Sequence, residues 1–227
     1  MGYRITIVVM LPTALQKLAV DPPKLHVGLT GELISHWRPD DRTITELDRR
    51  LRPGMKTLET GAGFTTIMFA IYRCCHTAIA PDKGLFERIQ RYCRENDIST
   101  ADLEFIDDMS IEVVPQLAPN LYDLALIDGC HGFPTVYVDF LYMARALKLG
   151  GTLVVDDMNI FTCQTVGRFM QADPSWRVDI ATKRVVFGVK VEETGGVLRE
   201  WHMQKFVRDR STASSIKARL ATYLGFY

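Results

Sequence analysis

The stretch TLETGAGFTTIMFA, residues Thr57 to Ala70, places two glycines, Gly61 and Gly63, between an apolar run and the start of a predicted helix. Glycine tolerates positive φ and lets a ligand approach the backbone closely, so such a loop is typical of a cofactor site. A dinucleotide-binding turn would carry a third glycine at position 66, where the helix packs closely beside a pyrophosphate. This chain has Thr66 there. The loop therefore disfavours a nicotinamide oxidoreductase and fits a ligand without phosphate better.

Short apolar, β-rich runs alternate with helical patterns on both sides of this loop. We predict helices over residues 65–73, 83–96 and 135–147, and strands over 55–60, 76–80, 103–106, 122–128 and 150–157. Alternation of this kind predicts an α/β fold with a doubly wound, mostly parallel sheet. Two further strands, over 176–181 and 184–191, indicate an antiparallel hairpin at one edge, which makes the sheet seven-stranded.

The two ends of the chain differ from this core. Helices are predicted over residues 11–20 and 43–51, the second opened by a capping box of Thr43 and Glu46. The basic tail ends in SSIKARLATYLGFY, which predicts a solvated helix with one packed face; a substrate lid or a dimer contact is the alternative. The chain thus divides into a helical N-terminal extension (1–51), a core (52–191) and a C-terminal tail (192–227).

Composition narrows the function classes. The 227 residues suffice for one sizeable α/β domain, and a formal net charge of zero gives no drive toward nucleic acid or an anionic membrane. The apolar run ITIVVMLP is too short to cross a bilayer and lacks a signal-peptide cleavage site, so we expect a cytoplasmic protein. The five cysteines form no CxxC pair and are expected to be reduced thiols.

Four blocks of sequence occur in a recognisable order: LETGAGFTT, HTAIAPD, LIDGCHGFP and LKLGGTLVVDD. Over residues 43–190 the chain resembles the class I S-adenosylmethionine-dependent methyltransferases. The resemblance implies a Rossmann-like methyltransferase fold whose glycine loop wraps the methionine end of the cofactor, with Glu59 helping to hold it. It implies cofactor contacts from Glu59, Thr60, Gly61, Gly63, Thr65, Thr66, Asp82, Asp108, Met109, Ser110, Asp128 and Gly129.

The chain departs from this family at the ribose. The family usually ends its second strand with an acidic residue that binds both ribose hydroxyls, but this chain has Ala80, with Asp82 two residues later as the substitute. The adenine region is expected at residues 107–110. Asp107 and Asp108 could equally be a charge pair at a helix N-terminus, which the helix dipole favours.

Acidic residues follow two strands that we expect to be neighbours. Asp128 ends the fourth strand, and Asp156 and Asp157 end the fifth, so all three carboxylates should meet at the edge that carries the glycine loop. Close carboxylates repel one another and are costly to bury without a counter-charge. A hard divalent cation relieves that cost, and oxygen ligands suit Mg²⁺. Alternatively, Asp128 serves the cofactor or the loop, and Asp156 and Asp157 cap a turn.

The same cluster resembles that of metal-dependent O-methyltransferases, in which residues at the positions of Asp128, Asp156 and Asp157 hold Mg²⁺. His131 lies in a glycine-flanked loop three residues past Asp128. An imidazole with a near-neutral pKa can accept a proton from a hydroxyl, so His131 and Asp128 are the catalytic candidates. Otherwise His131 contacts the cofactor or steers the loop.

The sequence therefore predicts in-line methyl transfer from S-adenosylmethionine to a small-molecule hydroxyl, with Mg²⁺ as Lewis acid. Two alternatives stay open: a metal-independent methyltransferase acting on another acceptor, and a methyltransferase-like fold that only binds. The expected partners are a small-molecule acceptor and a second copy of the chain, bound through the terminal extensions, with neither nucleic acid nor membrane. The identity of the acceptor carries no motif.

Overall fold

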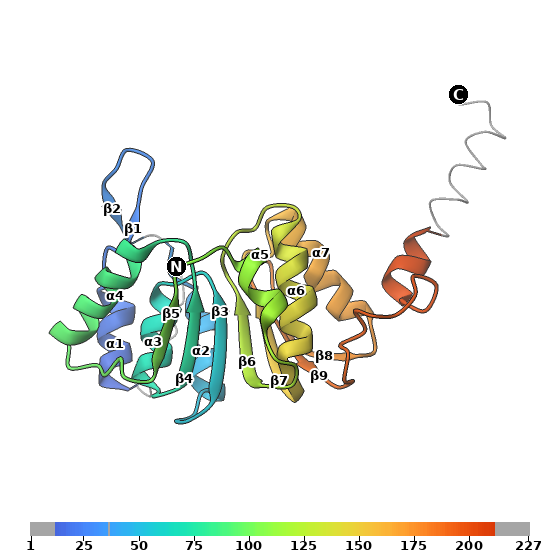
Figure 1. The fold of residues 1–227 in the computed structure, drawn as a ribbon, viewed down its shortest axis with the longest axis horizontal. Coiled ribbons are helices and arrows are strands. Elements are labelled where there is room, and N and C mark those ends of the chain that lie inside the picture. The colour runs from blue at the N-terminus through green and yellow to red at the C-terminus, as the bar shows by residue number, and fades with distance from the viewer. Residues whose placement is uncertain (1–11, 36, 212–227) are drawn as a thin grey trace, which may run out of the picture.

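The computed structural model describes residues 12–35 and 37–211. Its central sheet has seven strands: β3 (Lys56–Thr60), β4 (Cys75–Ile79), β5 (Leu103–Ile106), β6 (Tyr122–Ile127), β7 (Leu147–Val155), β8 (Trp176–Ala181) and β9 (Val186–Lys190). The strand order is β5-β4-β3-β6-β7-β9-β8, as Figure 1 shows. Strands β3 to β7 are parallel, and β9 runs antiparallel to both β7 and β8. The predicted α/β sheet with its C-terminal antiparallel hairpin is confirmed.

Helices cover both faces of the sheet. They are α1 (Thr13–Val20), α2 (Asp41–Arg50), α3 (Phe64–Ile71), α4 (Lys83–Glu95), α5 (Ser110–Val113), α6 (Thr135–Ala146) and α7 (Phe161–Ala172), with a 3₁₀ turn η1 (Val114–Gln116) after α5. A small hairpin of β1 (His26–Val27) and β2 (Leu33–Ile34) stands apart from the sheet (Figure 1). The predicted elements agree to within a few residues.

The sequence did not predict α7, α5 or the β1–β2 hairpin. Helix α7 contains Gly167 and two threonines, Thr162 and Thr165, which are weak helix formers. A Cβ at Gly167 would lie 2.4 Å from the Met158 sulfur and 3.2 Å from the Val186 side chain on β9, so the glycine lets this helix pack closely on the sheet. Tertiary contact therefore overrides the local propensity of this segment.

The core consists of two layers that follow the alternation of the strands. In β6, Leu124 and Leu126 belong to the cluster that includes α1 to α4, whereas Ala125 and Ile127 belong to the cluster that includes α6 and α7. Successive side chains of a strand point to opposite faces, so a strand that is apolar throughout must be covered on both sides. This explains why residues 124–127 form a continuous apolar run, with Asp123 as the charged residue near the start of the strand.

The N-terminal cap of α2 differs from the predicted one. The helix begins at Asp41, and the Asp40 carboxylate accepts a hydrogen bond from the Thr43 backbone N–H at 2.7 Å. Glu46 instead pairs with Arg49 at 3.0 Å. The predicted capping box of Thr43 and Glu46 is therefore wrong, because Asp40 already satisfies the free amide of the first turn.

The chain continues past β9 into a segment anchored on the sheet. The Trp176 indole N–H donates to the Gly195 carbonyl at 2.8 Å, and Arg199 pairs with Asp173 at 3.0 Å. Residues 205–211 are helical and lie at the α7 end of the molecule in Figure 1. The amphipathic stretch 214–227 and the apolar run 5–11 lie outside the described residues. Among the described helices, none combines the length and apolarity needed to cross a membrane.

Candidate active site

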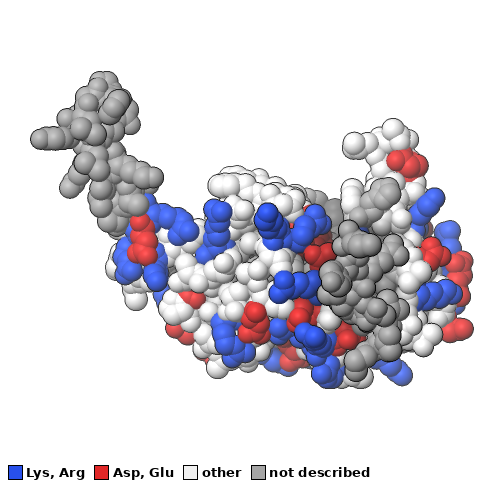
Figure 2. Space-filling model, turned by 180° about the vertical axis from the view of Figure 1, so that it is seen from behind, with Lys and Arg blue, Asp and Glu red and all other residues white. Residues whose placement is uncertain are grey.

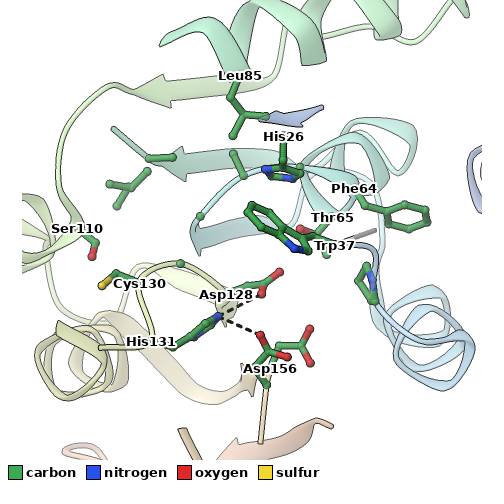
Figure 3. A pocket seen from close by; sticks show the side chains of 18 of the residues that line it. His26, Trp37, Phe64, Thr65, Leu85, Ser110, Asp128, Cys130, His131 and Asp156 are labelled. Carbon is green, nitrogen blue, oxygen red and sulfur yellow. Dashed lines mark ion pairs between the residues drawn. The ribbon is translucent and has the colours of Figure 1, made fainter. Parts of the chain in front are cut away.

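A cavity of about 710 Å³ opens at the carboxyl ends of β3, β4, β6 and β7. Parallel sheets bind their ligands at this edge, and the size suits a cofactor or small substrate. Figure 3 shows its walls, which come from the strand ends and from the segment before α2. The residues that line it are His26, Trp37, Arg38, Pro39, Gly61, Ala62, Gly63, Phe64, Thr65, Ile79, Ala80, Pro81, Leu85, Met109, Ser110, Asp128, Gly129, Cys130, His131, Asp156, Asp157 and Arg184.

Two glycines let the ends of β3 and β6 approach each other. Gly61 has φ +95°, and a Cβ there would lie 2.3 Å from the Asp128 carbonyl oxygen. A Cβ on Gly129 would lie 3.0 Å from the Gly61 nitrogen. The Asp128 N–H donates to the Thr60 carbonyl at 3.0 Å, which fixes this crossing. Gly61 is thus required by the packing of the strand ends as well as by any ligand beside it.

The carboxylate of Glu59 organises the glycine loop from beneath. It is fully buried and accepts hydrogen bonds from the hydroxyls of Thr65, at 2.6 Å, and Thr66. The Thr66 hydroxyl in turn accepts the Gly63 N–H at 2.8 Å. Thr66, at the position of the third dinucleotide-loop glycine, therefore ties the loop to Glu59.

A buried histidine that the sequence analysis did not single out completes this network. His76 Nε2 lies 3.2 Å from Glu59 Oε1, its Nδ1 lies 2.8 Å from the Thr57 hydroxyl, and its ring stacks on Phe69 at 4.2 Å. The glycine loop and its surroundings thus contain two kinds of predicted cofactor residue. Those that face the cavity are Gly61, Gly63 and Thr65, and those that support the loop without lining the described cavity are Glu59, Thr60 and Thr66.

The predicted ribose and adenine residues separate into two groups. Ala80, Met109 and Ser110 line the cavity. The described cavity wall does not include Asp82 or Asp108. Asp82 caps α4 by accepting the Leu85 N–H at 2.8 Å and pairs with Arg88 at 3.2 Å. Asp108 accepts the N–H of Met109, its own neighbour, at 2.7 Å.

The acidic edge forms opposite the glycine loop. His131 Nε2 lies 3.3 Å from Asp157 Oδ2 and 4.0 Å from Asp128 Oδ1, contacts that Figure 3 marks with dashed lines. Arg184 reaches Asp157 Oδ1 at 3.2 Å. One ligand atom from each of Asp128, His131 and Asp157 lies within 4.8 Å of the others, close enough to hold a metal ion. Asp156 lines the cavity beside this group, so the compact set contains His131 in place of Asp156.

The electrostatics of this edge reflect crowding. Burial, and then the charges of Asp156 and Glu59, raise the pKa of Asp128 well above its usual range. Burial likewise raises the pKa of Asp156, and it outweighs a hydrogen bond from the Asp157 backbone that lowers this pKa. Burial alone would lower the pKa of His131, but hydrogen bonds with Asp157 and Cys163 outweigh it and raise this pKa to about 10. The same bond from His131 lowers the pKa of Asp157.

Helix α7 holds His131 in this position. The Cys163 sulfur lies 3.3 Å from His131 Nδ1, and the Thr162 hydroxyl donates to the His131 carbonyl. Asp157 itself adopts φ +50°, a left-handed conformation that is uncommon for a non-glycine residue and is concentrated at functional sites. All five cysteines lie in described segments and are free thiols.

The outer wall of the cavity comes from the segment before α2. The rings of His26 and Trp37 lie 4.8 Å apart, and Trp37 is 63% exposed within the cavity wall. Arg38 and Pro39 continue the wall. These residues and Arg184 were not predicted, because they lie in segments without a motif that would distinguish them from other surface positions.

The comparisons with known proteins agree with this architecture. Residues 58–158 match the family model for a methyltransferase domain. This segment runs from β3 to just past β7 and carries both the glycine loop and the acidic edge. A comparison with curated proteins finds no match to the chain.

Several solved structures share the fold. A cofactor-bound protein from MTB has a TM-score of 0.59 and 14% identity, covering 82% of this chain and 94% of that one. A protein from Staphylococcus aureus, provisionally named a caffeoyl-CoA O-methyltransferase, has a TM-score of 0.55 and 15% identity, covering 67% and 85%. A methyltransferase from Geobacter sulfurreducens has a TM-score of 0.54 and 18% identity, covering 66% and 78%. The chain therefore has the Rossmann-like methyltransferase fold.

Proposed function

We propose that this protein is an S-adenosylmethionine-dependent methyltransferase that methylates a hydroxyl of a small molecule with the help of Mg²⁺. The observation that carries the proposal is one cavity with a glycine loop on one side and the group Asp128, His131 and Asp157 on the other. The methyltransferase-domain match covers both sides. The O-methyltransferase name of one fold neighbour agrees with a hydroxyl acceptor.

The cofactor would lie along the strand ends. Gly61, Gly63 and Thr65 would hold its methionine end, and Met109 and Ser110 would flank the adenine, since these residues line the cavity. The methyl side chain at position 80 offers no carboxylate to the ribose. When bound, the cofactor supplies a methyl group on a sulfonium, and the chain aligns this group with the acceptor oxygen.

The acidic edge fits a divalent cation. The pKa values of Asp128 and Asp156 are raised because crowded, buried carboxyls lack enough counter-charge, and a cation would offset that cost. Asp128 and Asp157 would provide carboxylate oxygens, which suit Mg²⁺. Bound there, Mg²⁺ would lower the pKa of the acceptor hydroxyl.

His131 is the group that would receive the hydroxyl proton. With a pKa of about 10 it carries its own proton at neutral pH, and imidazolium cannot accept another. Its Nε2 must therefore leave Asp157 before it can act as a base. Away from Asp157 the ring would lose the interaction that raises its pKa and would release its proton to solvent. The neutral ring would then be able to take the proton of the acceptor hydroxyl, while the cofactor would supply the methyl group.

One observation favours a metal-independent methyltransferase as the second candidate. His131 and Arg184 both pair with Asp157, so this carboxylate already has two cationic partners from the chain. In that case Asp128 is the base, because its raised pKa makes it a stronger proton acceptor than an ordinary carboxylate.

Ligand binding to the purified full-length protein tests these proposals without a known acceptor. We expect calorimetry to detect S-adenosylmethionine binding. We expect electron paramagnetic resonance to detect Mn²⁺ bound to the wild type and weaker Mn²⁺ binding to Asp157→Asn. Asp123→Asn is the matched control, since Asp123 pairs with Lys148 and lies at the opposite end of β6. If the protein bound the cofactor but not Mn²⁺, the Mg²⁺-assisted reaction would be overturned and the metal-independent methyltransferase would be supported. Absence of cofactor binding would overturn the methyltransferase and leave a binding module.

A further inference from the structure

A fully buried carboxyl group lies behind the cavity wall. Asp139, on α6, has no exposed surface, and neither of its carboxyl oxygens has a hydrogen-bond partner among residues 12–35 and 37–211. The hydroxyl of Thr60 is also buried, and within the same described segments it too lacks a partner. Buried polar atoms in proteins are nearly always hydrogen-bonded, so two such groups near one cavity require an explanation.

Two other buried charged residues of the core have partners. Asp173, which is similarly buried, uses its Oδ1 to pair with Arg199 at 3.0 Å and to accept the Ser175 N–H at 3.0 Å, and only its Oδ2 lacks a partner among the described residues. Lys190 donates to the carbonyl of Ala144 at 3.0 Å and to that of Leu147. Asp139 therefore does not follow the pattern of this core, and an apolar residue of similar size would cost the fold less.

Two hydroxyls lie near Asp139, and one of them belongs to a residue that lines the cavity. Burial raises the pKa of Asp139 to about 6, although the hydroxyls of Ser110 and Thr60 act to lower it. Both hydroxyls are therefore near the carboxyl, although neither completes a hydrogen bond with it. Strand alternation explains why Thr60 lies on the same side of the sheet as Asp139. Successive side chains of β3 point to opposite faces, so Glu59 points toward α3 and Thr60 points toward α6. Ser110 begins α5 and lines the cavity.

A hydroxyl has one proton to donate and two lone pairs. If the Ser110 hydroxyl donates its hydrogen bond to the Asp139 carboxylate, only the lone pairs of its oxygen remain for a ligand in the cavity. The wall then recognises a ligand group that donates a hydrogen bond, such as the exocyclic amine of an adenine.

We propose that Asp139 is a positioning residue of the cofactor site. In the ligand-bound protein its carboxylate accepts hydrogen bonds from the Ser110 and Thr60 hydroxyls, so that the Ser110 oxygen presents a hydrogen-bond acceptor to the amino group of the ligand. This rests on the proposed function, because it takes the ligand to be S-adenosylmethionine. On this proposal the Asp139 carboxyl group lowers the stability of the fold but strengthens cofactor binding.

Replacement of Asp139 by leucine tests this in the full-length protein. Asp139→Leu should raise the thermal midpoint by about 2–6 °C, because it removes an unpartnered buried carboxyl. It should weaken S-adenosylmethionine binding about tenfold in calorimetry. Asp139→Asn keeps one acceptor oxygen and should fall between leucine and wild type. Adding Ser110→Ala to Asp139→Leu should weaken binding little further, since both changes remove the same contact.

Asp173→Leu is the matched control. It removes a similarly buried but paired carboxyl, so it should lower the thermal midpoint and leave the cofactor affinity within about twofold. A lower midpoint for Asp139→Leu, or an unchanged affinity, would overturn the inference, as would fully additive losses from Ser110→Ala and Asp139→Leu. Wild-type protein that binds no S-adenosylmethionine would overturn the proposed function and this inference together. Binding by the wild type that Asp139→Leu leaves unchanged would overturn the inference alone.

Discussion

The glycine loop after β3 and the acidic edge after β6 and β7 line the same cavity but balance their polar groups differently. In the loop, the Glu59 carboxylate is buried with three partners: the hydroxyls of Thr65 and Thr66 and the ring of His76. At the acidic edge, Asp128 and Asp156 have raised pKa values because they are crowded and buried.

The difference separates two kinds of site. The loop is preorganised, since the chain itself supplies the partners that hold Glu59 in place. At the acidic edge, His131 and Arg184 both pair with Asp157, and among the described residues Asp128 and Asp156 are left without a comparable partner. A bound cation would offset this crowding. The surface view in Figure 2 shows acidic and basic side chains interspersed over the face drawn there. Substitutions in the loop should therefore affect folding and binding together, whereas those at the edge should depend on pH and on ligands.

The largest effect is expected from Gly61→Ala in the loop. The added Cβ would lie 2.3 Å from a backbone oxygen of Asp128, and φ is +95°, so the strand ends must separate. We expect a loss of roughly 3–5 kcal/mol in the free energy of unfolding, measured by urea denaturation. Gly150→Ala is the control: φ is +81°, but no described atom lies within 4 Å of its Cβ, so only backbone strain of about 1 kcal/mol applies. Equal losses would refute the packing role.

Glu59→Gln should remove the preorganisation of the loop. An amide cannot accept from both threonine hydroxyls, so one buried donor loses its partner, at a cost of about 2–3 kcal/mol. Cofactor affinity should fall with stability, as calorimetry and urea denaturation can measure. Glu46→Gln, which breaks the surface pair with Arg49, should change stability by less than about 0.5 kcal/mol. If the two variants were equally stable, the buried network would contribute nothing.

The acidic edge should show its dependence on pH through His131. Its pKa is raised to about 10, so its stabilising contribution is complete below pH 6.5 and is lost as pH rises toward 10. His131→Asn should therefore lower the free energy of unfolding by about 1–2 kcal/mol at pH 6 and by little above pH 10. Urea denaturation at several pH values measures this. His202→Asn, on an exposed residue, is the control. A difference that grows with pH would contradict the prediction.

The smallest change in affinity is expected at Ala80, which lines the cavity after β4 and has no carboxylate to offer a ligand. Ala80→Asp should tighten S-adenosylmethionine binding about tenfold, roughly 1.5 kcal/mol, because a charged acceptor would face the ribose hydroxyls. Ala80→Asn should give a smaller gain. If Asp82→Ala instead caused a large loss of affinity, Asp82 would already serve the ribose despite capping α4.

Much of the fold and part of the site could be predicted from local patterns. Residues 122–127, apolar apart from Asp123, indicated a strand covered on both faces, and Asp128 had to follow at the ligand edge of the sheet. Gly61 and Gly63 marked the loop because few other residues adopt such backbone conformations. These features depend on residues adjacent in the chain, so the sequence by itself determined them.

Other features depend on residues far apart in the chain, and only the tertiary structure decided them. His76 meets Glu59 because parallel β3 and β4 pair in register, and Asp139 faces Thr60 because α6 crosses that face of the sheet. The outer wall formed by His26 and Trp37 comes from a segment without periodicity. No local pattern encodes which side chains meet across such distances. The physical reason is that burial and pairing are properties of the packed chain, whereas periodicity and turn chemistry are properties of its neighbouring residues.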